Sequence, residues 1–170
     1  MSRTPLLALA AAALALSGCS GLHPLYGGGP EGQVRSTLSA VEVAPIPGQS
    51  GWLVANALRD RLGLDGRTAR YRLEVKLDDQ IAGLGVSRDD SVSRERRTLR
   101  ARYQLVEISN GQVVLDATAG SDAGIDVVGS EYATIAAEKT ALERLSGIVA
   151  DQIIARVARY AEAAPEAGAK

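Results

Sequence analysis

Alternating apolar and polar residues run through the middle of the chain. Tyr71, Leu73, Val75 and Leu77 alternate with charged side chains, and residues 99–105 repeat this pattern. A two-residue period is typical of a strand with one buried face and one solvated face. The pattern predicts strands at 41–46, 71–77, 99–105 and 113–119. We expect a bulge at 78–79 with the second strand continuing over 81–86, and a polar loop or exposed strand end at 87–97. Residues 121–128 are expected to form a link, with or without a short strand.

The Asn110-Gly111 pair predicts a hairpin turn between the last two strands. A two-residue loop would place Leu105 opposite Asp116. A type I turn followed by a bulge at Gly111 would instead place Leu105 opposite Leu115, and it would keep the apolar side chains on one face. We therefore favour the second register.

A period of three to four residues predicts two helices. Val54, Leu58 and Leu62 form a stripe in the first helix, for which Ser50 is the expected cap and Gly63 the expected end. The second helix begins after Ser130 and carries an apolar stripe through residue 160. That stripe comprises Ile135, Leu142, Leu145, Val149, Ile153, Val157 and Tyr160.

The resulting order, β-α-β-β-β-α, predicts an α+β fold. We expect a two-layer sandwich in which two helices pack on a four-stranded, mostly antiparallel sheet. One domain over residues 40–161 accounts for these elements, and residues 162–170 are expected to form a disordered tail. The chain lacks Phe and has one Trp, so Leu, Val, Ile and Ala must fill the core.

The first residues indicate export and lipid attachment. Arg3 precedes an uncharged run rich in Leu and Ala, which ends at Leu16-Ser17-Gly18-Cys19. The run has the length of a signal-peptide core and is too short to span a bilayer. Leu-Ser-Gly-Cys resembles the lipobox of bacterial lipoproteins. The alternative is an ordinary signal peptide, but Cys19 is the only cysteine.

The lipobox resemblance implies that residues 1–18 are removed as a signal peptide and that Cys19 carries a diacylglycerol and an N-acyl chain. More than one acyl chain suffices for firm membrane anchoring. Residues 19–39, which are rich in glycine, are expected to form a flexible tether. Ser20 stands where an Asp would favour inner-membrane retention, so the resemblance favours the outer membrane, on its periplasmic side.

One segment concentrates positive charge. Six arginines lie within residues 88–102, against Asp89, Asp90 and Glu95. Guanidinium groups match phosphate oxygens in a bidentate geometry, so the cluster is a candidate site for the phosphate groups of a ligand. The alternative is a solvated strand face balanced by the three acidic residues. The candidates are Arg88, Arg94, Arg96, Arg97, Arg100 and Arg102.

Several longer motifs together resemble one family. Pro24-Leu25-Tyr26-Gly27 follows the lipobox, and Ile125-Asp126-Val127-Val128 precedes Ser130-Glu131-Tyr132-Ala133 at the start of the last helix. With the strand pattern, these resemble the lipopolysaccharide-assembly lipoprotein family LptE in its alphaproteobacterial form. The family fold has two helices on a four-stranded sheet. The resemblance implies a non-enzymatic subunit of the lipopolysaccharide translocon, which plugs a large outer-membrane β-barrel (LptD-like), assists its assembly and helps deliver lipopolysaccharide. It also implies that lipopolysaccharide supplies the phosphates for the arginine cluster.

Aromatic residues are candidates for the contact with such a partner. Trp52 and Tyr132 could anchor an interface, although either is equally well explained as core. Catalysis has little support, because the only histidine, His23, lies in the tether. No metal-ligand spacing occurs, we expect no cofactor beyond the lipid on Cys19, and nucleic acid is a poor periplasmic partner.

Two other functions remain open. One is an auxiliary lipoprotein of a phospholipid or ABC-type envelope transporter, which could share a small α+β fold. The other is a lipid-anchored hydrolase. A stable β-barrel partner would separate the translocon subunit from the transporter lipoprotein.

Overall fold

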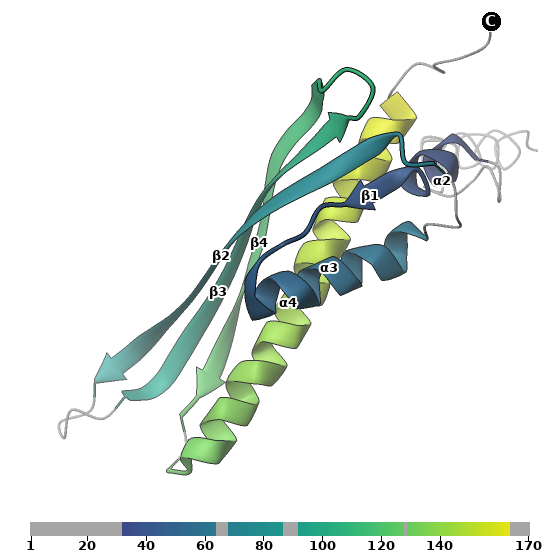
Figure 1. Cartoon of the computed structure of the whole chain (residues 1–170). Helices are drawn as coiled ribbons and strands as arrows, with labels where there is room; N and C mark the ends of the chain where they lie inside the picture. The colour runs from purple at the N-terminus through teal and green to yellow at the C-terminus, as the bar shows by residue number, and fades with distance from the viewer. Residues whose placement is uncertain (1–31, 64–67, 87–91, 128, 164–170) are drawn as a thin grey trace, which may run out of the picture.

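Four strands form one sheet, and two helices cover one of its faces (Figure 1). The computed structural model describes residues 32–63, 68–86, 92–127 and 129–163. In chain order the elements are α2 (Gln33–Leu38), β1 (Val41–Val43), α3 (Gly48–Leu62), β2 (Tyr71–Val86), β3 (Val92–Glu107), β4 (Val113–Asp126) and α4 (Glu131–Ala163).

The strand order across the sheet is β1-β2-β3-β4. β1 pairs with β2 in parallel, whereas the other two pairings are antiparallel. This arrangement confirms the predicted α+β class and the mostly antiparallel sheet. In the described part of the chain, no helix is both long and apolar enough to span a membrane.

Helix α2 was not predicted, because the sequence analysis assigned its residues to the tether. Val34 and Leu38 lie four residues apart, so they share one helix face, and both are buried. Their helix packs against α4 (Figure 1). Two apolar residues in one short turn give too weak a periodicity to identify a helix without this tertiary contact.

Strand β2 continues to Val86 as predicted, whereas β3 is longer than its apolar alternation indicates. The two strands pair without a register shift from Tyr71 opposite Glu107 to Val86 opposite Val92, so the predicted bulge at 78–79 is wrong. For residues 87–97 a loop or an exposed strand end was expected. Residues 92–97 are strand, which confirms the second alternative there, and residues 87–91 lie outside the described residues. β4 extends to Asp126, through residues that were expected to form a link with or without a short strand. Opposite charges face each other in this extension, where Arg94 of β3 lies opposite Asp126 of β4.

The register between β3 and β4 confirms the bulged hairpin. Leu105 lies opposite Leu115, and the register shifts between Leu105 and Val106. Gly111 has a positive φ of 70°, which a glycine adopts without strain. This register keeps Tyr103 and Leu105 on the buried face.

The core lies between the sheet and the two long helices. Leu73, Leu99 and Leu105 project from the sheet, and they are fully buried together with Leu58 of α3 and Leu145 of α4. α3 begins at Gly48, two residues before the expected cap, and it ends as predicted at Gly63, whose φ is 60°.

The first turns of α4 carry little of this core. The buried residues of α4 begin only at Ala141. Ile135, which was predicted in the apolar stripe, is 53% exposed. The stripe prediction therefore fails at its N-terminal end.

Candidate functional site

The second face of the sheet carries no helix, and we call it the open face (Figure 1). Because side chains alternate along a strand, the even-numbered residues of β2, β3 and β4 point to it, opposite the buried odd-numbered ones. Its charges balance. The basic side chains are Arg72, Lys76, Arg94, Arg96, Arg100 and Arg102, and the acidic ones are Glu42, Glu74, Asp78, Asp116, Asp122 and Asp126.

Arginines of β3 form ion pairs with aspartates of β4 across this face. Arg94 Nε lies 3.1 Å from Asp126 Oδ1, and Arg100 Nη2 lies 3.4 Å from Asp122 Oδ2. Arg102 Nη2 lies 3.1 Å from Asp116 Oδ2. β4 therefore supplies a counter-charge to each of these three arginines.

Of the three acidic residues expected to balance the cluster, the structure describes only Glu95. Asp89 and Asp90 fall outside the described residues. Glu95 has odd parity on β3 and therefore points to the helix side of the sheet. Its Oε2 atom is buried, and within the described residues it has no hydrogen-bond partner.

Two of the aspartates are held in their charged form. Hydrogen bonds from Arg102 and then Gln104 lower the pKa of Asp116, while Asp116 in turn raises the pKa of Arg102. A hydrogen bond from Thr98 and the charge of Arg100 lower the pKa of Asp122. These carboxylates stay ionised at neutral pH and would take up protons only at a pH below the ordinary range of aspartate.

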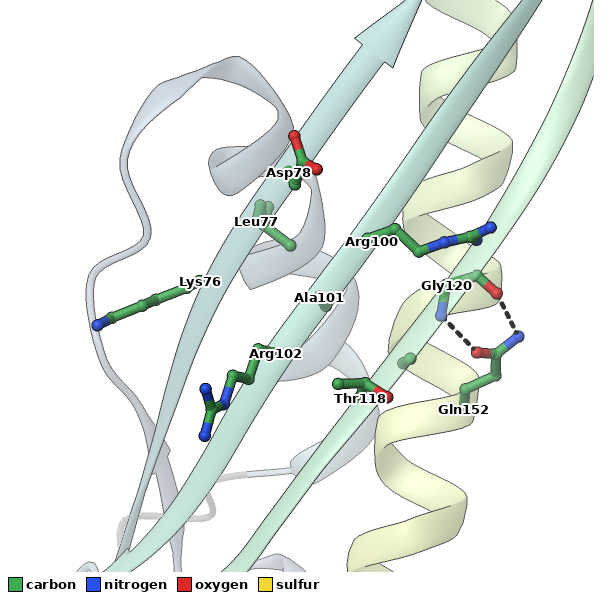
Figure 2. Close-up of a pocket in the computed structure, with 10 residues that line it drawn as sticks. Lys76, Leu77, Asp78, Arg100, Ala101, Arg102, Thr118, Gly120 and Gln152 are labelled. Carbon is green, nitrogen blue, oxygen red and sulfur yellow. Dashed lines mark hydrogen bonds between the residues drawn. The ribbon is translucent and has the colours of Figure 1, made fainter.

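A shallow hollow of about 640 Å³ lies in the middle of the open face. Lys76, Arg100 and Arg102 line it together with Thr118 of β4, and Figure 2 shows Lys76 pointing away from Arg100, which extends over Gly120. Lys76 has no ion-pair partner among the described residues. The lining therefore includes three cations, of which two are held only by exposed pairs. Exposed ion pairs contribute at most about 1 kcal/mol each, so an incoming anion could replace the aspartates.

Glycine at position 120 makes room for one of these cations. A Cβ built on Gly120 would lie 2.5 Å from Arg100 Cδ and 3.0 Å from the Leu99 carbonyl oxygen. The Arg100 side chain thus lies across this glycine on its way to Asp122 (Figure 2). At the outer edge of β4, Gln152 of α4 accepts a hydrogen bond from Gly120 N at 2.9 Å and donates one to Gly120 O at 3.2 Å.

The structure does not bring all six candidate arginines together. Arg94, Arg96, Arg100 and Arg102 share the open face, whereas Arg97 points to the opposite side. Arg97 forms two hydrogen bonds to Asp79, at 2.9 and 2.7 Å, and a third at 3.0 Å to the Glu138 carbonyl oxygen of α4. It therefore joins two strands to a helix. Arg88 and Cys19 lie outside the described residues.

Both candidate interface aromatics are exposed. Trp52 is 63% exposed and Tyr132 is 88% exposed, so their interpretation as core is wrong. Trp52 precedes the buried Val54 by two residues, which on a helix places it about 200° around the axis, on the solvent side. Tyr132 lies in the first turn of α4, before the buried residues begin.

Sequence reasoning missed several residues of the hollow. The hairpin register that it predicted places Thr118 opposite Arg102, and parity then places Asp116 on the same face. Lys76 could not be included, because its position opposite Arg102 depends on the pairing of β2 with β3. In the described residues, no group of three or more His, Cys, Asp or Glu side chains is arranged to hold a metal ion.

Solved structures share this fold. A lipoprotein from Caulobacter crescentus CB15 is 25% identical, with a TM-score of 0.68 over 78% of this chain and 100% of that chain. A minor lipoprotein from Acinetobacter baumannii is 15% identical, with a TM-score of 0.54 over 70% of this chain and 91% of that one. The rare lipoprotein B from Shewanella oneidensis is 12% identical, with a TM-score of 0.50 over 69% and 95%. No curated protein sequence matches the chain.

A family model provides the assignment that these fold similarities cannot. The LptE model, described as lipopolysaccharide-assembly, matches residues 38–157. The match runs from the end of α2 into the last third of α4, so it includes all four strands and both helices that cover the sheet. The chain therefore belongs to the LptE family of lipopolysaccharide-assembly proteins.

Proposed function

We propose that this protein is a lipid-anchored subunit of an outer-membrane machine that delivers lipopolysaccharide, and that it is not an enzyme. The observation that carries the proposal is the family match across the entire sheet and both covering helices. The family supports a role in lipopolysaccharide assembly. The anchor, the partner and the binding face are our extension of that role.

The proposed anchor is the lipid on Cys19, with the protein on the periplasmic side of the outer membrane. The lipobox at residues 16–19 supports this placement. About a dozen residues separate Cys19 from α2, and at up to about 3.5 Å per residue they would let the domain reach a partner in the same membrane. The partner we propose is a large LptD-like β-barrel whose lumen the domain plugs.

Two surface features support this partner. Trp52 and Tyr132 are large aromatic side chains that are mostly exposed, and such residues often dominate binding energy in protein interfaces. The open face carries equal numbers of positive and negative side chains, so it could lie against a polar barrel wall without a large excess of one charge.

The proposed lipopolysaccharide site is the hollow of the open face. A phosphate group there could accept hydrogen bonds from Arg100 and Arg102 in place of Asp122 and Asp116. Lys76 adds a cation that has no acidic partner in the described residues. The four open-face arginines of β3 (Arg94, Arg96, Arg100 and Arg102) remain candidates, whereas Arg97 is held by Asp79.

A pair of opposite variants tests this site. Arg100→Gln with Arg102→Gln should weaken binding of lipopolysaccharide micelles by about tenfold or more, because two charge-assisted hydrogen bonds are lost. Asp116→Asn with Asp122→Asn should strengthen it, because the competing carboxylates are removed. Equilibrium binding of the purified domain measures both, and circular dichroism checks the fold.

Charge reversal is the more severe form of the first variant. Arg100→Glu with Arg102→Glu should abolish binding while the domain remains folded. Unchanged affinity in a folded arginine variant, or weaker binding in the aspartate variant, would refute the assignment of lipopolysaccharide to the open face.

A further inference from the structure

A second basic hollow lies around the edge of the sheet, between β4 and the C-terminal half of α4. It measures about 580 Å³ and we call it the edge groove. Its cations, Arg156 and Arg159, come from α4, and Tyr103 and Thr118 line it from the sheet. The edge groove shares Thr118 and Gln152 with the hollow of the open face, whereas Arg156, Arg159 and Tyr103 line the edge groove alone.

We infer that the edge groove is an anion site, which takes a phosphate group between Arg156 and Arg159. The inference stands on the geometry of the groove. It rests on the proposed function only for the source of the phosphate, which we take to be a phosphorylated glycolipid.

The two guanidinium groups are available to a ligand. Arg156 and Arg159 are three residues apart on α4, so they lie on one helix face, and both are exposed. Neither forms an ion pair within the described residues. Arg159 donates only from Nε, at 3.3 Å to the Ala155 carbonyl oxygen, which leaves its terminal nitrogens free to donate.

The remaining lining adds further donors. Both backbone polar groups of Gly120 point outward to Gln152, and strand groups alternate in direction, so the N–H of Thr118 also points outward at this edge. The Tyr103 side chain is 2% exposed, and burial raises the pKa of its hydroxyl, so it stays a neutral donor. The positive charges of Arg156 and Arg159 act in the opposite direction and lower the pKa of Tyr103, so both guanidinium groups lie near its ring.

One carboxylate also lines the groove, but it is already bound. Asp116 accepts hydrogen bonds from Arg102 Nη2 at 3.1 Å and from Gln104 Nε2 at 2.8 Å. Those partners lie on the open face, so the carboxylate does not neutralise Arg156 or Arg159 through an ion pair. The groove therefore presents donors and positive charge, and phosphate oxygens are suitable acceptors for both.

Small side chains leave space for this ligand. Ala117 of β4 and Ala155 of α4 face the groove. Gln152 also lines the groove, and its two hydrogen bonds to Gly120 hold α4 against the strand there.

Nitrogen-15 NMR of the purified domain tests the site with pyrophosphate as the probe. Pyrophosphate should shift the Nε–H signals of Arg156 and Arg159 and the amide of Thr118 in a saturable manner. Arg156→Gln with Arg159→Gln should abolish the Thr118 shift. Arg144→Gln should leave it unchanged, because Arg144 is an exposed arginine of the same helix that lines a different hollow.

A second variant removes the space without removing the charge. Ala155→Leu, at an exposed helix position, should fill the groove and weaken pyrophosphate binding at least tenfold while both arginines remain. Absence of shifts at Arg156, Arg159 and Thr118 in the wild type, or shifts confined to the open-face arginines, would overturn the inference. Full binding in the Ala155→Leu variant would also overturn it.

Competition identifies the source of the phosphate. Lipopolysaccharide should displace pyrophosphate from the edge groove, whereas enzymatically dephosphorylated lipopolysaccharide and phosphatidylglycerol vesicles should not. Displacement only by the vesicles, or by none of these lipids, would exclude the glycolipid source that we infer. The proposed function is judged separately, since its test uses open-face variants that leave Arg156 and Arg159 intact.

Discussion

Two arginines of β3, three residues apart, have opposite surroundings. Arg94 forms an exposed ion pair with Asp126, in which the side chains are 64% and 75% exposed. Arg97 and Asp79 are 13% and 19% exposed, and Arg97 also binds a backbone carbonyl of α4. Arg94 therefore belongs to the solvated face of the sheet, whereas Arg97 stabilises the packing of the sheet against α4.

This difference predicts different costs of substitution. Arg97→Gln should destabilise the domain by about 2 kcal/mol, because it leaves the poorly solvated Asp79 carboxylate without its partner. Arg94→Gln should cost less than about 0.5 kcal/mol, because its pair is exposed. Urea unfolding of both variants measures the free energies of unfolding. Equal losses would show that Arg97 is no more important to the fold than a surface arginine.

The alternation of side chains along β3 would have assigned Arg94 and Arg97 to opposite faces of the sheet from the sequence alone. Arg97 shares odd parity with Leu99 and Ala101, which the sequence analysis placed on the apolar face. The arginines were nevertheless grouped by their proximity in sequence. The partners of Arg97 could not be predicted, because Asp79 was assigned to a bulge and Glu138 contributes only a backbone oxygen.

Among the elements, α3 is held close to the segment that precedes it. Gly51 is buried, and a Cβ at this position would lie 2.5 Å from the Ile46 carbonyl oxygen and 2.8 Å from its carbon. The chain between β1 and α3 thus lies directly against the helix backbone. A side chain at position 51 would force these two segments apart.

Gly51→Ala should therefore destabilise the domain by about 1–3 kcal/mol, as overpacking does. The matched control is Gly147→Ala in α4, where the nearest atom to the added Cβ is Arg61 Nη2 at 3.9 Å. That change should be stabilising by about 0.5–1 kcal/mol, since alanine is the better helix former. Chemical denaturation of both variants is the measurement. A stabilised Gly51→Ala variant would contradict the close approach.

The elements predicted from the sequence are those in which apolar residues recur at a regular spacing. The two long helices, the strand cores and the bulged hairpin register all follow from that pattern. The distal half of β3 lacks it, because charged residues such as Arg97, which pairs with Asp79 of β2, stand where apolar residues would show the alternation. The edge groove was not predictable either, since Arg156 and Thr118 come together only when α4 packs on β4.

The molecule as a whole has one face of the sheet covered and the other bare. The bare face is polar and balanced in charge, and the exposed Trp52 and Tyr132 lie on the helices instead. Such a surface suits a polar partner, which could form ion pairs with the sheet and contact the exposed aromatic residues of the helices. This arrangement is the structural basis for proposing that the domain sits inside a larger protein.

Recovery of that partner from native outer membranes is the measurement that decides the proposal. The tagged, full-length protein would be extracted in mild detergent, and the proteins bound to it quantified by mass spectrometry, with a Cys19→Ser variant as the unanchored control. We predict a large outer-membrane β-barrel in equal amount with the lipidated protein and a reduced amount with the control. Recovery of the protein alone, or with inner-membrane transporter subunits, would contradict the translocon function and favour the transporter lipoprotein.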